Sequence, residues 1–463
     1  MKKILKAIFP IKLNFAILQL EEYKYLRFLK WILKNFFKRS VPSKKPFVIT
    51  QKVKYLAVLF TLISLAFPLL TLLITKSLLA SFIVLLILLT QPYITLLFSL
   101  LLLKPYEMYN KNKTIENTRK KVTSFKNLKV IGITGSFGKS STKEILYQIL
   151  KAKFDVLKTP ESFNTIFGIA KVVDLELDKN HEYFICEMAA YNIGEINTLT
   201  YMVPPTYGIL TGITTQHFER FGSLENTIKA KFELVDAVKD KTNMVFNLND
   251  ENIQNELTKR KITNPTGFLK AQNIKFDKNG SSFDLFFGPK KYSVKTKLFG
   301  FASVKNIEAA SSMAHKLGLS PSYIVERIKS LNPVDNRFVL SQTDGKAVIV
   351  NNTYSSNPQG FRETINTAKN IKGKKVLVTP GLVELGEMEK QTHIDLGVYA
   401  QNIFDKIVLV GKNNRTVSFS KGLNNEKIVE FIEDNREDYF NTINKLKKEF
   451  DWIFLENDVT QNY

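Results

Sequence analysis

The chain has 463 residues, of which 44% are hydrophobic, and it carries a net charge of +23 at pH 7. This length exceeds one ordinary domain and predicts about three. The single cysteine, Cys186, excludes an internal disulfide, so the sequence does not describe a small disulfide-built secreted scaffold.

The positive charge is concentrated at the N-terminus. The first 126 residues contain 22 Lys and Arg against 4 Asp and Glu, which leaves only +5 for the rest of the chain. An enzyme that binds nucleic acid is expected to carry basic charge around its functional domain. Here the charge flanks apolar segments, which favours binding to anionic lipid headgroups. We therefore expect membrane lipids, and not nucleic acid, as the partner of this charge.

Residues 1–54 are expected to form a basic, amphipathic juxtamembrane segment. Lys and Arg alternate there with Phe, Leu, Ile and Trp31. Such a segment lies along the inner membrane surface, although an amphipathic helix of a soluble protein gives the same pattern.

Two uncharged apolar runs follow, 21 residues at 55–75 and 26 residues at 78–103. Crossing about 30 Å of hydrocarbon requires roughly 20 helical residues, so each run is long enough to span. Lysines flank the outer ends and only Lys76 lies in the turn. The positive-inside rule therefore predicts a transmembrane helical hairpin at 55–103, with two helices in the cytoplasmic membrane and the domains that follow it facing the cytoplasm. A basic linker is expected at 104–126.

From residue 127 the sequence alternates between strand and helix patterns, which predicts α/β domains with mostly parallel sheets. The first four strand-like runs are LKVIGIT (128–134), YFICEMA (183–189), TYGILTGI (206–213) and MVFNLN (244–249). Residues 282–300 are expected to form a β-hairpin. A second series, AVIVNN, KKVLVTP, KIVLVG and DWIFLE, begins near residue 340. We therefore expect a P-loop central domain at 127–337 and a Rossmann-like C-terminal domain at 338–463.

A glycine-containing loop lies between the first of these strands and a helix. Such a loop binds phosphates through backbone N–H groups at a helix N-terminus, with a lysine on the terminal phosphates and a hydroxyl on Mg²⁺. Ile133 stands where a glycine begins the usual nucleotide-binding motif. The residues expected to bind nucleotide here are Thr134, Gly135, Ser136, Phe137, Gly138, Lys139, Ser140 and Ser141.

The stretch TGSFGKSSTKE resembles the phosphate loop of the Mur ligases, the amide-bond-forming enzymes of peptidoglycan synthesis. Further similar stretches follow in the family's order: TPESFNTIFGIA (159–170), CEMAAYNIGEI (186–196) and TGITTQHFERFGSLENTIKAKFEL (211–234). NTYSSNP (352–358) and VELGEME (383–389) resemble elements of the D-alanyl-D-alanine-adding MurF branch. The resemblance covers roughly residues 127–463 and implies ATP-dependent ligation through an acyl phosphate.

Lys231 shares one face of an expected helix with Ile228, Phe232 and Val235. A lysine in this position either extends its ammonium past the apolar face into water or has a lowered pKa and a nucleophilic amine. The resemblance implies the second alternative, with Lys231 carbamylated by CO₂ and one carbamate oxygen near Mg²⁺.

Two further residues are expected at the metal site. Glu187 ends a buried-strand pattern, where a carboxylate is costly unless it binds a partner such as Mg²⁺. His217 alone is more typical of a structural histidine, but the resemblance implies a second-metal ligand. The expected metal ligands are thus Ser140, Glu187, His217 and Lys231.

Three residues further along are implied to contact the nucleotide or the reacting phosphate. Asn306 matches a nucleotide-contacting asparagine, and Asn352 stands where the MurF branch has an aspartate at the ribose. Arg337 matches an arginine at the hinge between the two domains, and an interdomain salt bridge is the alternative role. The expected catalytic residues are Lys139, Lys231, Arg337 and His217, with ATP and Mg²⁺ as cofactors.

The substrates are less defined by the sequence than the chemistry is. The hairpin stands where the family carries a domain for the UDP-linked precursor, and the chain ends in FLENDVTQNY where the branch often has Lys-Gly-Ser. We expect a UDP-linked or lipid-linked peptidoglycan precursor and an amino acid or dipeptide amine as substrates, with membrane lipids as partners. The alternatives are a ligase resembling poly-γ-glutamate synthetase and a non-catalytic nucleotide-binding membrane scaffold.

Overall fold

The computed structural model describes residues 10–21, 23–35, 47–161, 163–214, 221–334, 337–354, 357–383, 385–424 and 428–457. The chain divides into two compact units. Among the described residues, the first unit extends to Lys113 and the second begins at Thr114. Each unit is described by itself below.

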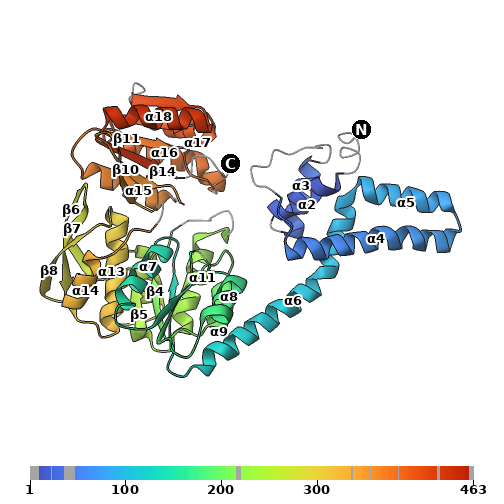
Figure 1. Cartoon of the computed structure of the whole chain (residues 1–463), viewed down its shortest axis with the longest axis horizontal. Helices are drawn as coiled ribbons and strands as arrows, with labels where there is room; N and C mark the ends of the chain where they lie inside the picture. The colour runs from blue at the N-terminus through green and yellow to red at the C-terminus, as the bar shows by residue number, and fades with distance from the viewer. Residues whose placement is uncertain are drawn as a thin grey trace. The chain divides into compact units, whose positions relative to one another are not determined.

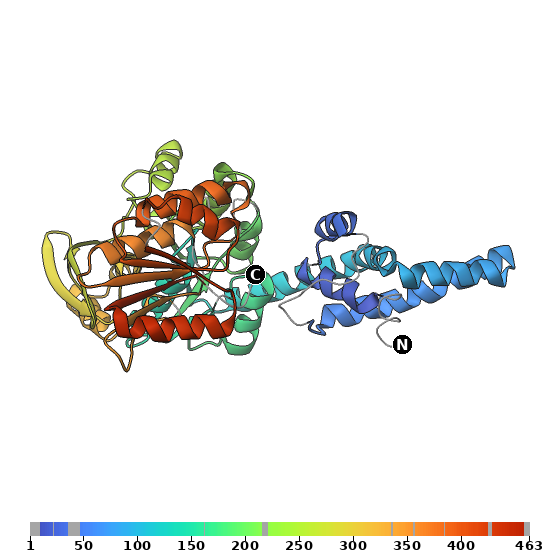
Figure 2. The ribbon, with the colours of Figure 1, turned by 90° about the horizontal axis from the view of Figure 1, so that it is seen from above.

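The first unit is helical. Its elements are α2 (Ile11–Leu20), α3 (Tyr25–Asn35), α4 (Gln51–Thr75), α5 (Leu78–Thr90) and the beginning of α6 (Pro92–Ser124). Helices α4 and α5 run side by side as an antiparallel hairpin (Figures 1 and 2). The chain reverses at Lys76, which adopts the left-handed conformation, and Ser77 caps α5 by accepting a hydrogen bond from Ala80 N at 3.2 Å.

The second apolar run is not one straight helix, as the sequence had led us to expect. It breaks at Gln91, and α5 and α6 meet at an angle of 83°. Pro92 explains the break, because a proline disfavours helical geometry in the residue before it, and Gln91 has φ −120° and ψ 60°. Among the described residues, α4 alone is long and apolar enough to cross a membrane by itself, and a second span exists only if the bent pair counts as one.

Helices α2 and α3 bury one apolar face each. Their inward side chains pack on the first half of α4 and on the start of α6, and the residues of this cluster are Phe15, Ile17, Leu18, Phe28, Ile32, Val53, Leu56, Phe60, Leu96, Leu100 and Leu103. Part of the amphipathic segment expected at 1–54 is therefore packed on the hairpin's base, while its residues 1–9, 22 and 36–46 lie outside the described part.

The stretch expected as a basic linker, 104–126, is helical as far as Ser124. Its last turns belong to the second unit and pack on it. Tyr201 donates a hydrogen bond to Glu116 at 3.0 Å, and Lys121 donates one to the carbonyl of Asp174 at 2.9 Å. Arg119 stacks on the Tyr201 ring at 4.1 Å.

The central domain is built on a five-stranded parallel sheet of order β2-β3-β1-β4-β5. Its strands are β1 (Lys129–Thr134), β2 (Val156–Lys158), β3 (Tyr183–Glu187), β4 (Tyr207–Leu210) and β5 (Met244–Phe246). Its helices are α7 (Lys139–Leu150), α8 (Ile166–Glu176), α9 (Glu195–Met202), α11 (Leu224–Ala237), α12 (Glu251–Lys259), α13 (Phe301–Lys316) and α14 (Pro321–Lys329), with a 3₁₀ turn η1 (Lys241–Asn243).

Helices cover both faces of this sheet (Figure 1). Helices α8, α9, α11 and α12 contribute to the core on one face, and α7, α13 and α14 to the core on the other. The parallel strands place all their carboxyl ends at one edge, where α7 and α8 begin, so side chains from distant parts of the sequence meet there.

The hairpin expected at 282–300 is part of a three-stranded antiparallel sheet. Strands β6 (Lys270–Asp277), β7 (Gly280–Phe287) and β8 (Lys290–Thr296) follow one another in order. Phe283, Leu285 and Val294 turn from this sheet into the core under α13 and α14.

The C-terminal domain contains a six-stranded sheet of order β13-β12-β11-β14-β10-β9, in which only β9 is antiparallel. Its strands are β9 (Val339–Gln342), β10 (Val348–Asn352), β11 (Lys375–Thr379), β12 (Lys406–Val410), β13 (Val429–Ile432) and β14 (Trp452–Glu456). Its helices are α15 (Pro358–Lys369), α16 (Glu389–Ala400), α17 (Asn414–Lys421) and α18 (Arg436–Glu449), with a 3₁₀ turn η2 (Gly386–Met388). This arrangement confirms the expected α/β fold with a mostly parallel central sheet.

Candidate active site

The phosphate loop connects β1 to α7 and is closely packed. Gly138 has φ 74° at the N-cap of α7, a left-handed conformation that glycine adopts without strain. A Cβ on Gly135 would lie 2.1 Å from Thr211 Oγ1. The backbone N–H of Ser136 donates to the carbonyl of Gly212 at 2.8 Å. The loop therefore has the strand–turn–helix context that phosphate binding requires.

Lys139 begins α7 and folds back over the loop. Its ammonium donates to the carbonyl of Gly135 at 2.8 Å, where a phosphate would offer a better acceptor. Burial lowers the pKa of Lys139, an effect that Glu187 opposes and Arg337 reinforces. Lys139 is thus within electrostatic reach of both of these expected site residues.

Glu187 ends β3 and is buried, with 1% of its surface exposed. One carboxylate oxygen accepts from Lys143 Nζ at 3.0 Å, and the other accepts from Asn164 Nδ2 at 3.1 Å. Burial favours the neutral acid, but Lys143, Lys139 and the hydrogen bonds from Asn164 and Ser140 outweigh it, and the pKa of Glu187 is lowered. Glu187 is accordingly an anion in contact with Ser140, the other expected metal ligand.

The sequence interpretation assigned no role to Lys143 or to Asn164. Both stand in stretches similar to the family, TGSFGKSSTKE and TPESFNTIFGIA, but residue type alone does not reveal that their side chains meet Glu187. One signal was present, because Lys143 follows Lys139 by four residues and so lies on the same face of α7.

Lys231 lies on α11 and is 3% exposed. Its ammonium lies 5.6 Å from the ring centroid of Phe221, and no carboxylate among the described residues forms an ion pair with it. Burial and the nearby Lys139 lower its pKa to about 7, although Glu195, Glu233 and Glu187 act in the opposite direction. A substantial fraction of this amine is neutral at pH 7, the form that reacts with CO₂.

His217, expected as a catalytic and metal-binding residue, lies outside the described residues. Within the described part of the chain there is no cluster of three His, Cys, Asp or Glu side chains that could hold a metal ion. The donors that do converge are the Glu187 carboxylate and the Ser140 hydroxyl. They suit Mg²⁺, which is commonly held by one or two protein oxygens, water and substrate phosphates.

Asn306 on α13 lies against the phosphate loop. Its Oδ1 accepts a hydrogen bond from Thr142 Oγ1 at 3.2 Å and would lie 2.6 Å from a Cβ on Gly138. The structure thus places Asn306 beside the phosphate loop, and its contact with a nucleotide stays a prediction.

Arg337 follows the last helix of the central domain and lies two residues before β9. Its guanidinium stacks 4.2 Å above the ring of Tyr354, which comes from the loop after β10. Arg337 also lowers the pKa of Lys139, so its positive charge is close enough to influence the phosphate loop. No ion pair of Arg337 occurs within the described residues, so its expected alternative role as an interdomain salt bridge finds no partner there.

Asn352 ends β10, but its side chain points into the C-terminal domain. Its amide donates to Glu456 Oε2 at 2.9 Å and to Thr364 Oγ1 at 3.3 Å. Thr364 also donates to the same oxygen of Glu456 at 2.6 Å, and Glu456 is fully buried. The amide of Asn352 therefore hydrogen-bonds the buried carboxylate of Glu456 instead of facing the phosphate loop.

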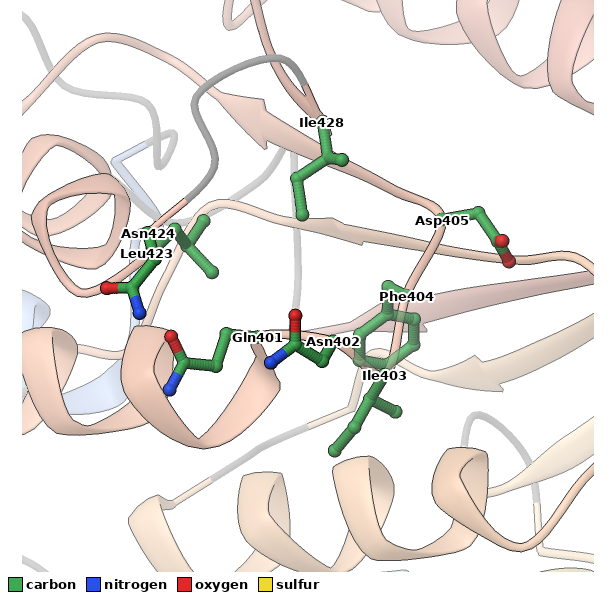
Figure 3. A pocket seen from close by; sticks show the side chains of 8 residues that line it. All are labelled: Gln401, Asn402, Ile403, Phe404, Asp405, Leu423, Asn424 and Ile428. Atoms are coloured by element: carbon green, nitrogen blue, oxygen red, sulfur yellow. The ribbon is translucent and has the colours of Figure 1, made fainter.

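Two hollows of the C-terminal domain lie at a different edge. One, of about 240 Å³, is lined by the turn from Gln401 to Asp405 and by Leu423, Asn424 and Ile428 (Figure 3). The other, about 510 Å³, borders the same turn. This turn precedes β12, so both hollows lie at the amino end of the parallel strands, opposite the edge where sites form in such sheets.

Comparison with known proteins identifies both domains. The Mur ligase middle domain matches residues 133–314, and the Mur ligase glutamate ligase domain matches residues 336–455. Two relatives are named UDP-N-acetylmuramoyl-tripeptide--D-alanyl-D-alanine ligase. The one from Borreliella burgdorferi is 30% identical over 69% of each chain, and the one from Bacillus subtilis is 27% identical over 61% of this chain. The match spans 63% of the length of the Bacillus protein.

The fold agrees with these matches. The crystal structure of the MurF ligase from Thermotoga maritima in complex with ADP superposes with a TM-score of 0.67 at 24% identity, covering 75% of this chain and 80% of that one. The first matched domain coincides with the α/β domain that holds the phosphate loop. The second coincides with the α/β domain in which Asn352, Thr364 and Glu456 are hydrogen-bonded to one another. The chain therefore belongs to the Mur ligase family.

Proposed function

We propose that this protein is an ATP-dependent ligase of the MurF type, which joins the carboxylate of a peptidoglycan precursor peptide to the amine of D-alanyl-D-alanine or a similar compound. The observation that carries the proposal is the convergence of Lys139, Glu187 and Lys231. They come from three elements far apart in the sequence, yet Lys139 and Glu187 each act on the pKa of the other, and both act on the pKa of Lys231. The names of the relatives support the choice of substrates.

The residues of the candidate active site have different roles in an in-line phosphoryl transfer. The backbone of the phosphate loop and Lys139 hold the terminal phosphates of ATP, and Arg337 adds positive charge as the substrate carboxylate attacks the γ-phosphate. The products of this step are ADP and an acyl phosphate. The amine then attacks the acyl carbon, and inorganic phosphate leaves as the amide bond forms.

Ser140, Glu187 and a carbamate on Lys231 are the groups that would hold Mg²⁺. The ion supplies charge neutralisation for the phosphates when it is bound. Carbamylation joins the neutral amine of Lys231 to CO₂ and releases one proton, which converts a buried basic side chain into an anionic oxygen donor. His217 remains a proposed additional ligand.

The test is a product analysis with the full chain in detergent. ATP, Mg²⁺, UDP-N-acetylmuramoyl-tripeptide and D-alanyl-D-alanine are supplied, and phosphate release and the mass of the product are measured. We expect one phosphate for each pentapeptide formed. Absence of phosphate with every precursor offered supports a non-catalytic scaffold instead, and a glutamate polymer supports a ligase of the poly-γ-glutamate type.

We also propose that the α4–α5 hairpin inserts into the cytoplasmic membrane. It exposes many large apolar side chains: Leu62, Leu65, Phe67, Leu69, Leu70, Leu73, Ile74, Leu78, Leu79, Phe82, Ile83, Leu86 and Ile87. Its threonine hydroxyls are satisfied within their own helices, since Thr61, Thr71 and Thr75 each donate to the carbonyl four residues earlier. An exposed apolar surface whose threonine hydroxyls are paired suits hydrocarbon.

A matched pair of substitutions tests the insertion. Leu73 and Leu175 are about equally exposed, at 68% and 69%, but Leu175 lies on α8 of the central domain. Leu73→Arg should shift the protein from the carbonate-resistant membrane fraction to the soluble fraction, whereas Leu175→Arg should not. A cysteine at Ser77 should react with an impermeant thiol reagent from outside the cell if the hairpin crosses twice, and buried Cys186 should remain silent. Equal membrane retention of both variants contradicts the insertion.

The membrane hairpin leads to a finer proposal about the substrate. A lipid-linked tripeptide would be presented to a membrane-bound enzyme at high local concentration. Nanodisc-bound enzyme offered lipid-linked and UDP-linked tripeptide side by side should then prefer the lipid-linked form. A chain lacking residues 1–103, which retains the part of α6 packed on the central domain, serves as the control. Equal or better use of the UDP-linked form by the full chain, unchanged in the shortened chain, contradicts the lipid-linked proposal and leaves the proposed ligase activity unaffected.

A further inference from the structure

Lys143 is a buried lysine for which the proposed chemistry has no role. It lies on α7 one turn after Lys139, and 1% of its surface is exposed. Its ammonium donates to Glu187 Oε2 at 3.0 Å and to the carbonyl of Glu161. Lysines are almost never buried this deeply unless they are paired, so the position requires a specific partner.

Glu187 needs a positive charge whenever its carboxylate is ionised. The strand that carries it is buried throughout, and the residues on either side, Cys186 and Met188, are fully buried. An unpaired carboxylate in such surroundings is strongly unfavourable. Lys143 is the only described side chain that forms an ion pair with Glu187.

The remaining contacts of Glu187 fix the direction of its carboxylate. Asn164 donates to Oε1 at 3.1 Å, and Thr159 Oγ1 accepts from the backbone N–H of Glu187 at 3.1 Å. With Oε2 held by Lys143, both oxygens have defined positions before any ligand arrives. A preoriented carboxylate next to the Ser140 hydroxyl is what a cation with strict octahedral geometry requires.

We propose that Lys143 is the positioning and counter-charge residue of the cation site: it orients Glu187 and neutralises it while the site is empty, and it limits how tightly a divalent cation binds. The proposal rests on the function proposed above, because it requires Glu187 to be a cation ligand. Lys143 stabilises the empty site by pairing with the carboxylate and destabilises the filled site by repelling the cation.

This dual effect separates Lys143 from an ordinary structural ion pair. Removing its charge should destabilise the empty protein and should also tighten cation binding, because the empty state loses a favourable interaction and the filled state loses an unfavourable one. A structural ion pair alone predicts the first effect without the second.

The experiment uses the full chain in detergent and Mn²⁺ as the only added probe, with free Mn²⁺ measured by electron paramagnetic resonance. Lys143→Met should lower the Tm of the metal-free protein by about 5–10 °C. It should bind Mn²⁺ about tenfold more tightly than the unmodified chain and recover most of the lost Tm when Mn²⁺ is added. Lys143→Arg keeps the charge and should retain the original affinity.

Two further variants distinguish the ways in which the proposal can fail. Lys143→Gln removes the charge but keeps a hydrogen-bond donor, so it gives the same comparison if Lys143→Met folds poorly. Unchanged Mn²⁺ affinity in the neutral variants, with a Tm loss that Mn²⁺ does not restore, overturns the role of Lys143. Unchanged Mn²⁺ affinity in Glu187→Gln shows instead that Glu187 is not a ligand, which is a failure of the proposed function.

Discussion

The ammonium of Lys143 and the carboxylate of Glu187 lie 3.0 Å apart, with side chains that are 2% and 1% exposed. The pair joins α7, which begins at the phosphate loop, to the carboxyl end of β3. Because Lys139 and Ser140 lie on the first turn of the same helix, α7 positions the expected phosphate-binding lysine, the expected metal-binding hydroxyl and the partner of the expected metal-binding acid.

Lys139→Ala should abolish ATP-dependent chemistry without unfolding the protein. The side chain is half-buried and its hydrogen bonds are to loop carbonyls, so its loss removes little packing, whereas the transferring phosphate loses a preorganised positive charge. Such losses lower kcat by about 10²–10³. Phosphate release by Lys139→Ala is compared with that of Lys179→Ala, an exposed lysine of the same domain. Near-normal turnover in Lys139→Ala would show that the phosphate loop takes no part in the mechanism.

Lys231→Ala should be severely impaired and partly rescued by small carboxylates such as formate or acetate, which replace the anionic oxygen of the carbamate. The control is Lys229→Ala two residues away, where the exposed lysine pairs with Glu225 at 3.0 Å. Turnover is measured in buffer depleted of CO₂ and then in bicarbonate. If Lys231→Ala matches Lys229→Ala in both, Lys231 is structural.

The pKa of about 7 for Lys231 predicts a pH dependence of carbamylation. Below pH 7 the ammonium form predominates and cannot react with CO₂, so the carbamate signal in ¹³C NMR with ¹³CO₂ should fall as the pH drops from 8 to 6. Stability changes in the same direction, because the unfolded lysine binds more protons than the folded one between pH 7 and its ordinary pKa of 10.5. This group therefore makes the protein more stable as the pH rises through that interval. A carbamate signal that is absent at every pH, or independent of pH, contradicts the assignment.

Asn352→Asp should destabilise the C-terminal domain by about 1–3 kcal/mol. Although the MurF branch usually carries aspartate at this position, in this chain the new carboxylate would face the buried carboxylate of Glu456 and lose the hydrogen bond of 2.9 Å. Urea denaturation compares it with Asn444→Asp on the exposed face of α18. If the two variants have the same free energy of unfolding, the contact between Asn352 and Glu456 does not contribute to stability.

The alternation of strands and helices could be predicted from the sequence because each buried strand is a short apolar run bounded by turn residues. Strands β2, β9 and β13 were missed, since three or four residues at the edge of a sheet carry too little pattern. Strand β6 was missed as well, because most of its side chains are exposed and it lacks an apolar run. The break at Gln91 does not follow from composition, because Pro92 lies within an otherwise uniform apolar run and acts only through the backbone of the residue before it.

The site was predictable where one residue acts within a local motif, and not where two distant residues meet. Lys139 and Ser140 follow from the loop itself. The partners of Glu187 and Asn352 do not, because Lys143 lies 44 residues from Glu187 and Asn352 lies 104 residues from Glu456. Asn352 stands where the resemblance to the MurF branch implies an aspartate, and its contact with Glu456 on β14 is not revealed by either position alone.

The most direct test of the central claim follows the oxygen of the substrate carboxylate. Precursor tripeptide whose reacting carboxylate carries ¹⁸O is converted with ATP and D-alanyl-D-alanine, and the released phosphate is analysed by mass spectrometry. Attack on the γ-phosphate transfers one labelled oxygen into each inorganic phosphate, with ADP unlabelled. Amide formation with unlabelled phosphate, or with the label in AMP, would contradict the acyl-phosphate mechanism.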